Sequence, residues 1–338
     1  MSYRFELREQ VGPAFARIAT EQIDRVLRDL TAPKDRNLAV HEGRKSLKRL
    51  RALFRLVRPG IGDHTFKAEN ARFREIAALF SADRDRHVLA SVAEQRAAAM
   101  GPRYRKTFAS VTKALAEQAE AAASNQQEAV SRLKAARKIV AELPLPESFQ
   151  TLQDGLAESY RRGRRQLRSA YADPHDEAFH DLRKSVQQHW RHMQVLQRAW
   201  PDLFVARLEA ARRLSQILGD DHDLAVFVAR LKTIPRSTLS AADRRAIERH
   251  CRVEQDRLRT LAHPLCQQLY AERAGQFAKR ITAMWLAATR LAEIEAAAAA
   301  KTKPKAPKPK ASKTKASSAP AKPAKRRGNS AQAAKPAP

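Results

Sequence analysis

Apolar residues recur every three or four positions along most of the first 300 residues, a spacing typical of amphipathic helices. Prolines and a Gly-Pro pair divide this pattern into four segments in each half. The first four are residues 13–30, the stretch around His41 up to Pro59-Gly60, residues 64–100 and residues 103–143, within which 117–128 is either exposed helix or a loop. The second four are 148–171, 176–199, 202–232 and 240–296, the last interrupted near Pro264. The sequence therefore predicts an all-α protein.

Two changes in composition divide the chain. Pro144-Leu145-Pro146 separates the two sets of segments, so we expect one domain over residues 5–143 and another over 147–296. Residues 301–338 contain ten Lys, two Arg and seven Pro but no acid. Such a segment cannot bury an apolar core, and it is expected to be a disordered basic tail.

The two halves share short motifs. His-x-x-Arg-Lys-Ser begins at His41 and again at His180, and the Leu79–Val88 segment resembles Ile217–Val226 at almost the same offset. Two matches at nearly one offset indicate an internal duplication. The predicted fold is therefore two four-helix bundles related by a pseudo-twofold axis.

The first motif opens a strongly cationic helix. At about 100° per residue one stripe collects His41, Arg44, Lys48, Arg51, Arg55 and Arg58, with Lys45 beside it and Arg49 further round. No acid occurs between Glu42 and Asp63. Like charges three or four residues apart destabilise a helix, whereas a solvated helix face usually alternates its charges. A binding site for a polyanion explains this stripe better than a solvated face, which stays the alternative.

The second motif carries less charge. His180, Arg183 and Lys184 are kept, Arg191 and Arg198 lie near the same stripe, and Gln187, Trp190 and Gln194 replace the basic residues of the first copy. A cluster on the preceding helix compensates, since Arg161, Arg164, Arg165 and Arg168 share one face. The predicted site thus has two unequal walls.

Charge and composition narrow the class of partner. The chain has 65 Lys and Arg against 36 Asp and Glu, a net charge of +29 that attracts nucleic acid, inorganic polyphosphate or anionic membranes. Cys251 and Cys266 have neither a metal-binding nor a disulfide-framework spacing. The N-terminus lacks the apolar run of a signal peptide, and no stretch could span a membrane. We expect a cytoplasmic protein.

These motifs resemble the CHAD family, the conserved-histidine α-helical domain. The resemblance rests on the duplicated His-x-x-Arg helix, on Arg161-Arg162-Gly163-Arg164-Arg165 and on Leu218-Gly219-Asp220-Asp221-His222-Asp223-Leu224. It implies two four-helix bundles that bind inorganic polyphosphate and associate with polyphosphate or other storage granules. It assigns that role to His41, Arg44, Lys45, Lys48, Arg49, Arg51, Arg161, Arg164, Arg165, His180, Arg183 and Lys184. Arg55, Arg168 and Arg191 share helix faces with these residues, so we add them to the predicted polyphosphate site.

Two other functions compete with this interpretation. The body and tail together are compatible with a histone-like protein that binds DNA in the nucleoid. A metal-dependent phosphohydrolase would use Asp220, Asp221 and Asp223 to hold Mg²⁺, although pairing of these acids with basic helices is the simpler interpretation. The sequence contains no glycine-rich phosphate loop, and cations surround both motif histidines. We therefore expect no catalysis, cofactor or bound metal.

Overall fold

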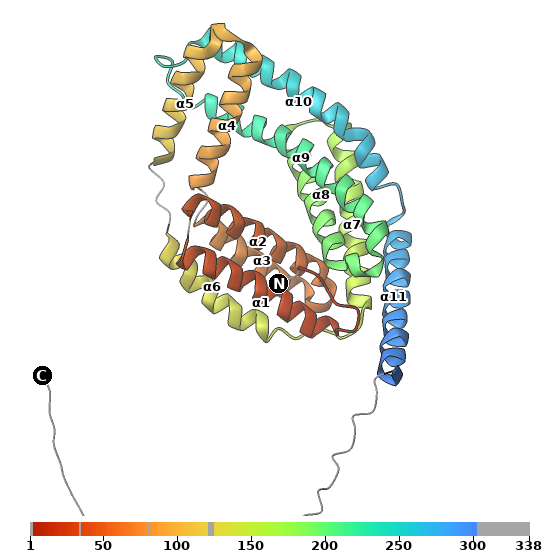
Figure 1. Ribbon diagram of the computed structural model, residues 1–338. Coiled ribbons are helices and arrows are strands. Elements are labelled where there is room, and N and C mark those ends of the chain that lie inside the picture. Colours follow the sequence, from red (N-terminus) through yellow and green to blue (C-terminus); the bar gives the residue numbers. More distant parts are fainter. Residues whose placement is uncertain (1–2, 34, 80–81, 121–124, 303–338) are drawn as a thin grey trace, which may run out of the picture. The chain divides into compact units, whose positions relative to one another are not determined.

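The computed structural model describes residues 3–33, 35–79, 82–120 and 125–302. Every regular element in this part of the chain is a helix, which confirms the predicted all-α class (Figure 1). The α-helices are α1 (Val11–Thr31), α2 (Arg36–Leu56), α3 (Arg58–Ala78), α4 (Ala82–Met100), α5 (Arg105–Glu120), α6 (Gln126–Ala141), α7 (Gln150–Ala172), α8 (Asp176–Leu196), α9 (Pro201–Leu231), α10 (Ala241–Leu269) and α11 (Ala274–Thr302).

Four helices of the first half form a bundle. Helix α1 packs against α2 and α6, and α3 packs against the same two helices (Figure 1). Their apolar faces meet at Phe15, Phe54 and Phe73, whose side chains are fully buried. The Phe54 ring contacts the rings of both Phe15 and Phe73. One face of α2 is buried in this core, so the cationic face of the helix points away from the core.

The second half continues the same core. Helices α7, α8 and α9 pack in chain order. Tyr160 of α7 stacks on Phe277 of α11 with ring centroids 4.2 Å apart. Both residues belong to the same apolar cluster as Phe15 and Phe54. One continuous core therefore supports α2 and α8, the two helices that carry the His-x-x-Arg-Lys-Ser motif.

A second core joins the halves at another place. It combines α4 and α5 with the C-terminal part of α9 and the N-terminal part of α10, and Phe108 stacks on Phe227 within it. Helices α9 and α10 run through both cores as single helices. The corresponding segments of the first half are each divided in two.

The predicted single helix over 64–100 is wrong, because α3 ends at Ala78 and α4 begins at Ala82. Phe73 of α3 is buried in the first core and Val92 of α4 in the second, so the two helices of this segment contribute to different cores. The same holds for Val111 of α5 and Leu133 of α6. For 103–143, the separate helices α5 and α6 agree with the alternative of a connection within 117–128. Residues 80–81 and 121–124 lie outside the described residues.

The predicted interruption near Pro264 is also misplaced. Helix α10 continues through Pro264 because Ala262, Cys266 and Leu269 remain buried on its inner face. The break follows instead at Tyr270. There the Tyr160 hydroxyl donates a hydrogen bond to the Leu269 carbonyl oxygen and accepts one from the backbone N–H of Glu272.

Several predictions are left open. Helices α7 and α8 follow one another as α1 and α2 do, but the duplication itself and the division into residues 5–143 and 147–296 stay predictions. Residues 1–297 form one compact unit. Two predicted segments lie outside what is described. They are the side chains of residues 81–88, in the segment that resembles Ile217–Val226, and residues 303–338 of the tail.

Candidate anion-binding site

Helix α2 separates apolar and cationic side chains as its sequence predicts. Leu50, Leu53 and Phe54 are completely buried. Lys48 and Arg51 lie on the opposite face, where they line a cavity of about 520 Å³. Helix formers such as Leu, Lys and Arg fill most of this helix, so local propensity and packing agree on its position.

We call this cavity the inner basin. It is lined by side chains of α2, α3, α7, α8 and α9, and its polar lining consists of basic and amide groups. Asp and Glu are absent from the described residues that line it. The lining residues are Arg44, Lys48, Arg51, Ala52, Arg55, Asn70, Arg74, Arg162, His180, Arg183, Lys184, Gln187, Gln188, Arg191 and His222.

A smaller cavity of about 300 Å³ adjoins the inner basin, and we call it the outer basin. The two share Arg55 and Arg162, so a basic surface runs from one into the other. The outer basin is lined by Arg55, Arg58, Glu158, Arg161, Arg162, Arg165 and Gln166. Unlike the inner basin, it includes a carboxylate.

The inner and outer basins together form a basic groove. Its basic side chains are close to one another and partly buried. Burial, together with the nearby charges of Arg162 and Arg58, lowers the pKa of Arg55 to about 10. Burial likewise lowers the pKa of Arg191 to about 10. Burial and the Arg74 charge lower the pKa of Arg51, whose Nε donates to Asn70 Oδ1 at 2.9 Å. A bound anion would relieve this mutual repulsion.

Two histidines stack in the wall of the inner basin. The rings of His180 on α8 and His222 on α9 lie 4.1 Å apart and nearly parallel. Burial lowers the pKa of both, and for His222 burial together with the neighbouring His180 and Arg183 lowers the pKa to about 3. Both imidazoles are therefore neutral at pH 7 and can present a ring N–H to an anion.

Close contacts between helices hold the walls together. His192 of α8 lies 2.9 Å from the carbonyl oxygen of Ala52 on α2, so its Nε2–H donates a hydrogen bond that joins the two helices. Gly155 of α7 lies against the last turn of α2, where a Cβ would overlap the carbonyl oxygen of Leu56. These contacts place the basic side chains of α7 and α8 opposite those of α2.

The structure brings most of the predicted site residues together. Arg44, Lys48, Arg51, Arg55, His180, Arg183, Lys184 and Arg191 line the inner basin. Arg55, Arg161 and Arg165 line the outer basin.

The remaining five predicted residues line neither basin: His41, Lys45, Arg49, Arg164 and Arg168. Lys45 Nζ is 2.7 Å from a carboxylate oxygen of Glu42. The Arg49 guanidinium lies over the ring of Tyr3. These contacts direct Lys45 and Arg49 to other neighbours, although both belong to the same cationic helix.

Sequence reasoning missed several lining residues. Asn70 and Arg74 stand one turn apart on α3, and nothing in the sequence places that helix beside α2 and α8. Arg162 lies inside the predicted arginine cluster but on another helix face. Gly163 beside it faces Tyr270, whose ring a Cβ there would overlap. Gln187 and Gln188 line the inner basin as well. Glutamine is uncharged, but its side-chain amide can still donate hydrogen bonds to an anion.

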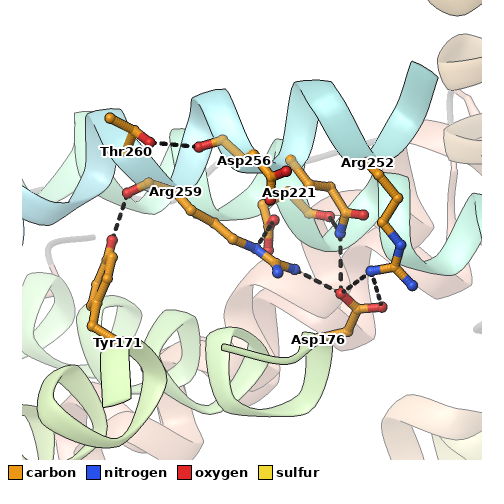
Figure 2. A network of polar contacts seen from close by, with 8 residues as sticks. Tyr171, Asp176, Asp221, Arg252, Asp256, Arg259 and Thr260 are labelled. Atoms are coloured by element: carbon orange, nitrogen blue, oxygen red, sulfur yellow. Dashed lines mark hydrogen bonds and ion pairs between the residues drawn. The ribbon is translucent and has the colours of Figure 1, made fainter. Parts of the chain in front are cut away.

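The acids considered as Mg²⁺ ligands have other partners. Arg259 of α10 donates hydrogen bonds to Asp221 of α9 at 2.7 Å and to Asp176 of α8 at 2.6 Å (Figure 2). Asp220 accepts from Gln216 at 3.0 Å. Over the described ranges, no three His, Cys, Asp or Glu side chains gather as a possible metal site. Asp221 thus joins helices, as the simpler interpretation of these acids predicted.

The fold and its cavities define an all-α protein with a basic groove between its helices. The family model described as the CHAD domain matches residues 11–232, well over half of the chain. The chain belongs to the CHAD domain family. No curated protein matches the sequence. None of the helices in the described ranges has an apolar stretch sufficient to cross a membrane.

Proposed function

We propose that this protein binds inorganic polyphosphate in the groove formed by the inner and outer basins and does not convert it chemically. The observation that supports this most is the acid-free lining of the inner basin, which contains arginine, lysine, histidine and amide side chains. Arginine binds phosphate oxygens in a bidentate manner, lysine supplies a point charge, and amides donate further hydrogen bonds.

The shape of the basic surface favours a chain of phosphates over a single small anion. The two basins share Arg55 and Arg162, which allows one ligand to contact residues of both. Partial burial excludes some water, so charge-assisted hydrogen bonds there are stronger than on an open surface. A linear polyanion would neutralise several crowded cations at once.

Binding of DNA is the competing function. The inner basin has no Phe, Tyr or Trp among its described lining residues on which bases could stack. This favours polyphosphate for the folded body. The lysine-rich residues 301–338 could bind DNA or polyphosphate, since phosphate contacts need no base reading.

The cellular role follows from the same chemistry. A protein that holds polyphosphate in a groove and adds a basic tail would associate with polyphosphate granules, or with the nucleoid if the tail prefers DNA. We propose the cytoplasm as its location. The tail would add avidity without a second folded site.

Binding of long-chain polyphosphate and of duplex DNA across a salt series tests this function. The triple variant Arg44→Ala/Lys48→Ala/Arg51→Ala removes three basic residues that line the inner basin. The matched control Arg137→Ala/Arg212→Ala/Arg257→Ala removes the same charge from exposed ion pairs outside both basins. We expect a loss of roughly 100-fold or more for polyphosphate in the first variant and a much smaller loss in the control.

Other outcomes would decide against the proposal. Equal loss in both variants would mean that net charge, not the groove, binds the anion. Tighter binding of DNA than of polyphosphate by the full chain, insensitive to the groove variant, would favour the histone-like function. Shortening of polyphosphate only when Mg²⁺ is present would indicate an enzyme.

A further inference from the structure

The outer basin contains a carboxylate where the rest of the groove is basic. Glu158 of α7 lines this cavity together with five arginines and Gln166. Its Oε1 accepts a hydrogen bond from Arg58 Nη1. The same carboxylate acts favourably on the charge of Arg55. Glu158 therefore supplies negative charge where a ligand phosphate would supply it.

Arg58 is already neutralised by two acids. Asp63 accepts from its Nε and Nη2 at 2.8 and 2.9 Å, and Glu158 binds its remaining amino group. The guanidinium also lies over the Phe66 ring. Hydrogen bonding to Asp63 raises the pKa of Arg58, in contrast to the lowered pKa of Arg55 at the end of α2. An anion entering the outer basin must compete with Glu158 for this arginine.

Glu158 can leave this position without moving its helix. Its side chain is 39% exposed, so it can rotate into solvent. The backbone of α7 is fixed nearby, because Gly155 lies in close contact with α2. Displacement of Glu158 would therefore open the basin by a side-chain movement alone.

We propose that the outer basin is a second phosphate subsite, occupied by the Glu158 carboxylate until a polyphosphate long enough to extend from the inner basin displaces it. The inference rests on the proposed function and adds selection by chain length. A short anion fits within the inner basin and leaves the Arg58–Glu158 pair intact. A long chain gains the outer arginines after the inner ones have bound it, at a high effective concentration.

The experiment compares tripolyphosphate with long-chain polyphosphate by calorimetry on the full chain. Glu158→Gln keeps the side-chain shape and removes the competing charge. We expect it to raise the ratio of long-chain to tripolyphosphate affinity by roughly three- to tenfold. The matched control Glu209→Gln removes an exposed acid of α9 outside both basins, where Glu209 pairs with Arg212. It should leave that ratio as in the wild type.

A second variant tests the subsite from its basic side. Arg161→Ala/Arg165→Ala removes two arginines of the outer basin that do not line the inner one. The loss of affinity for long chains should exceed the loss for tripolyphosphate by about tenfold. Circular dichroism confirms that each variant is folded.

The outcomes separate the two proposals. If both anions bind but Glu158→Gln shifts them equally, or not at all, the length-selective subsite is overturned while polyphosphate binding stands. Equal losses for both anions in Arg161→Ala/Arg165→Ala would overturn it as well. If the wild-type chain binds neither anion, both proposals fail.

Discussion

Gly155 of α7 passes so close to α2 that a Cβ on this residue would overlap the backbone carbonyl oxygen of Leu56. Glu158 and Arg162 follow one and two turns later on the same helix, and both line the outer basin together with Arg55 of α2. The absence of a side chain at residue 155 therefore sets the distance between two walls of the groove.

Replacing this glycine should destabilise the protein. Gly155→Ala forces α7 away from backbone that cannot rotate aside, and we expect a loss of about 3 kcal/mol in the free energy of unfolding. Urea unfolding followed by circular dichroism measures it. Gly275→Ala is the matched control, because among the described residues no atom outside its own stretch of helix lies within 4 Å of a Cβ there. A tolerated Gly155→Ala would contradict the close helix contact.

The ion pairs of Figure 2 predict that Arg259 cannot be replaced by lysine. Its side chain is 10% exposed and binds Asp221 through Nε and Asp176 through Nη2. A lysine ammonium is a point charge and cannot bind the two carboxylates in the geometry of the planar guanidinium. Arg259→Ala should cost about 3–5 kcal/mol because it leaves the buried Asp221 carboxylate without its cation.

Arg259→Lys should recover only part of that loss in urea unfolding. The control is Arg257→Lys, on the exposed face of the same helix, where Arg257 pairs with Glu254. It should leave the unfolding midpoint unchanged. Full recovery by Arg259→Lys would show that charge alone suffices at this position.

Buried His192 predicts a loss of stability in mild acid. Burial lowers its folded-state pKa from about 6.5 to about 4. Between these values the unfolded chain binds more protons than the folded one, so stability falls as the pH falls through this window. The contribution is about 1.4 kcal/mol per pH unit within it.

His192→Gln should remove this part of the pH dependence while keeping a donor for the Ala52 carbonyl oxygen. Urea unfolding at pH 7, 6 and 5 measures the slope. His175→Gln, at an exposed histidine, is the control and should keep the wild-type slope. An unchanged slope in His192→Gln would contradict the assignment.

The cavity and the sequence motif make different predictions for anion binding. Arg74 and Arg162 line the inner basin, whereas Lys45 and Arg164 do not. Arg74→Ala and Arg162→Ala should each weaken polyphosphate binding by about tenfold, since each removes a charge-assisted hydrogen-bond donor. Lys45→Ala and Arg164→Ala should have smaller effects. The reverse order in calorimetry would show that the motif residues, not the cavity, bind the ligand.

Much of the fold could be predicted because helices are local. The periodicity of Leu50, Leu53 and Phe54 indicates which face of α2 is buried, and the structure confirms it. The division of the third segment could not be predicted in the same way. Phe73 and Val92 have the same helical pattern but are buried in different cores, and a local pattern does not say which core a residue joins.

By itself the sequence determined the all-α class, the family resemblance and the cationic faces of α2 and α8, because charge and helical periodicity are properties of neighbouring residues. Only the tertiary structure decided which cations meet. It placed Arg74 and His222 in the inner basin and left His41 and Lys45 outside its lining. It also set Glu158 against Arg58. These relationships depend on the crossing of helices distant in sequence, which Gly155 and His192 hold in place through backbone contacts that no local pattern reveals.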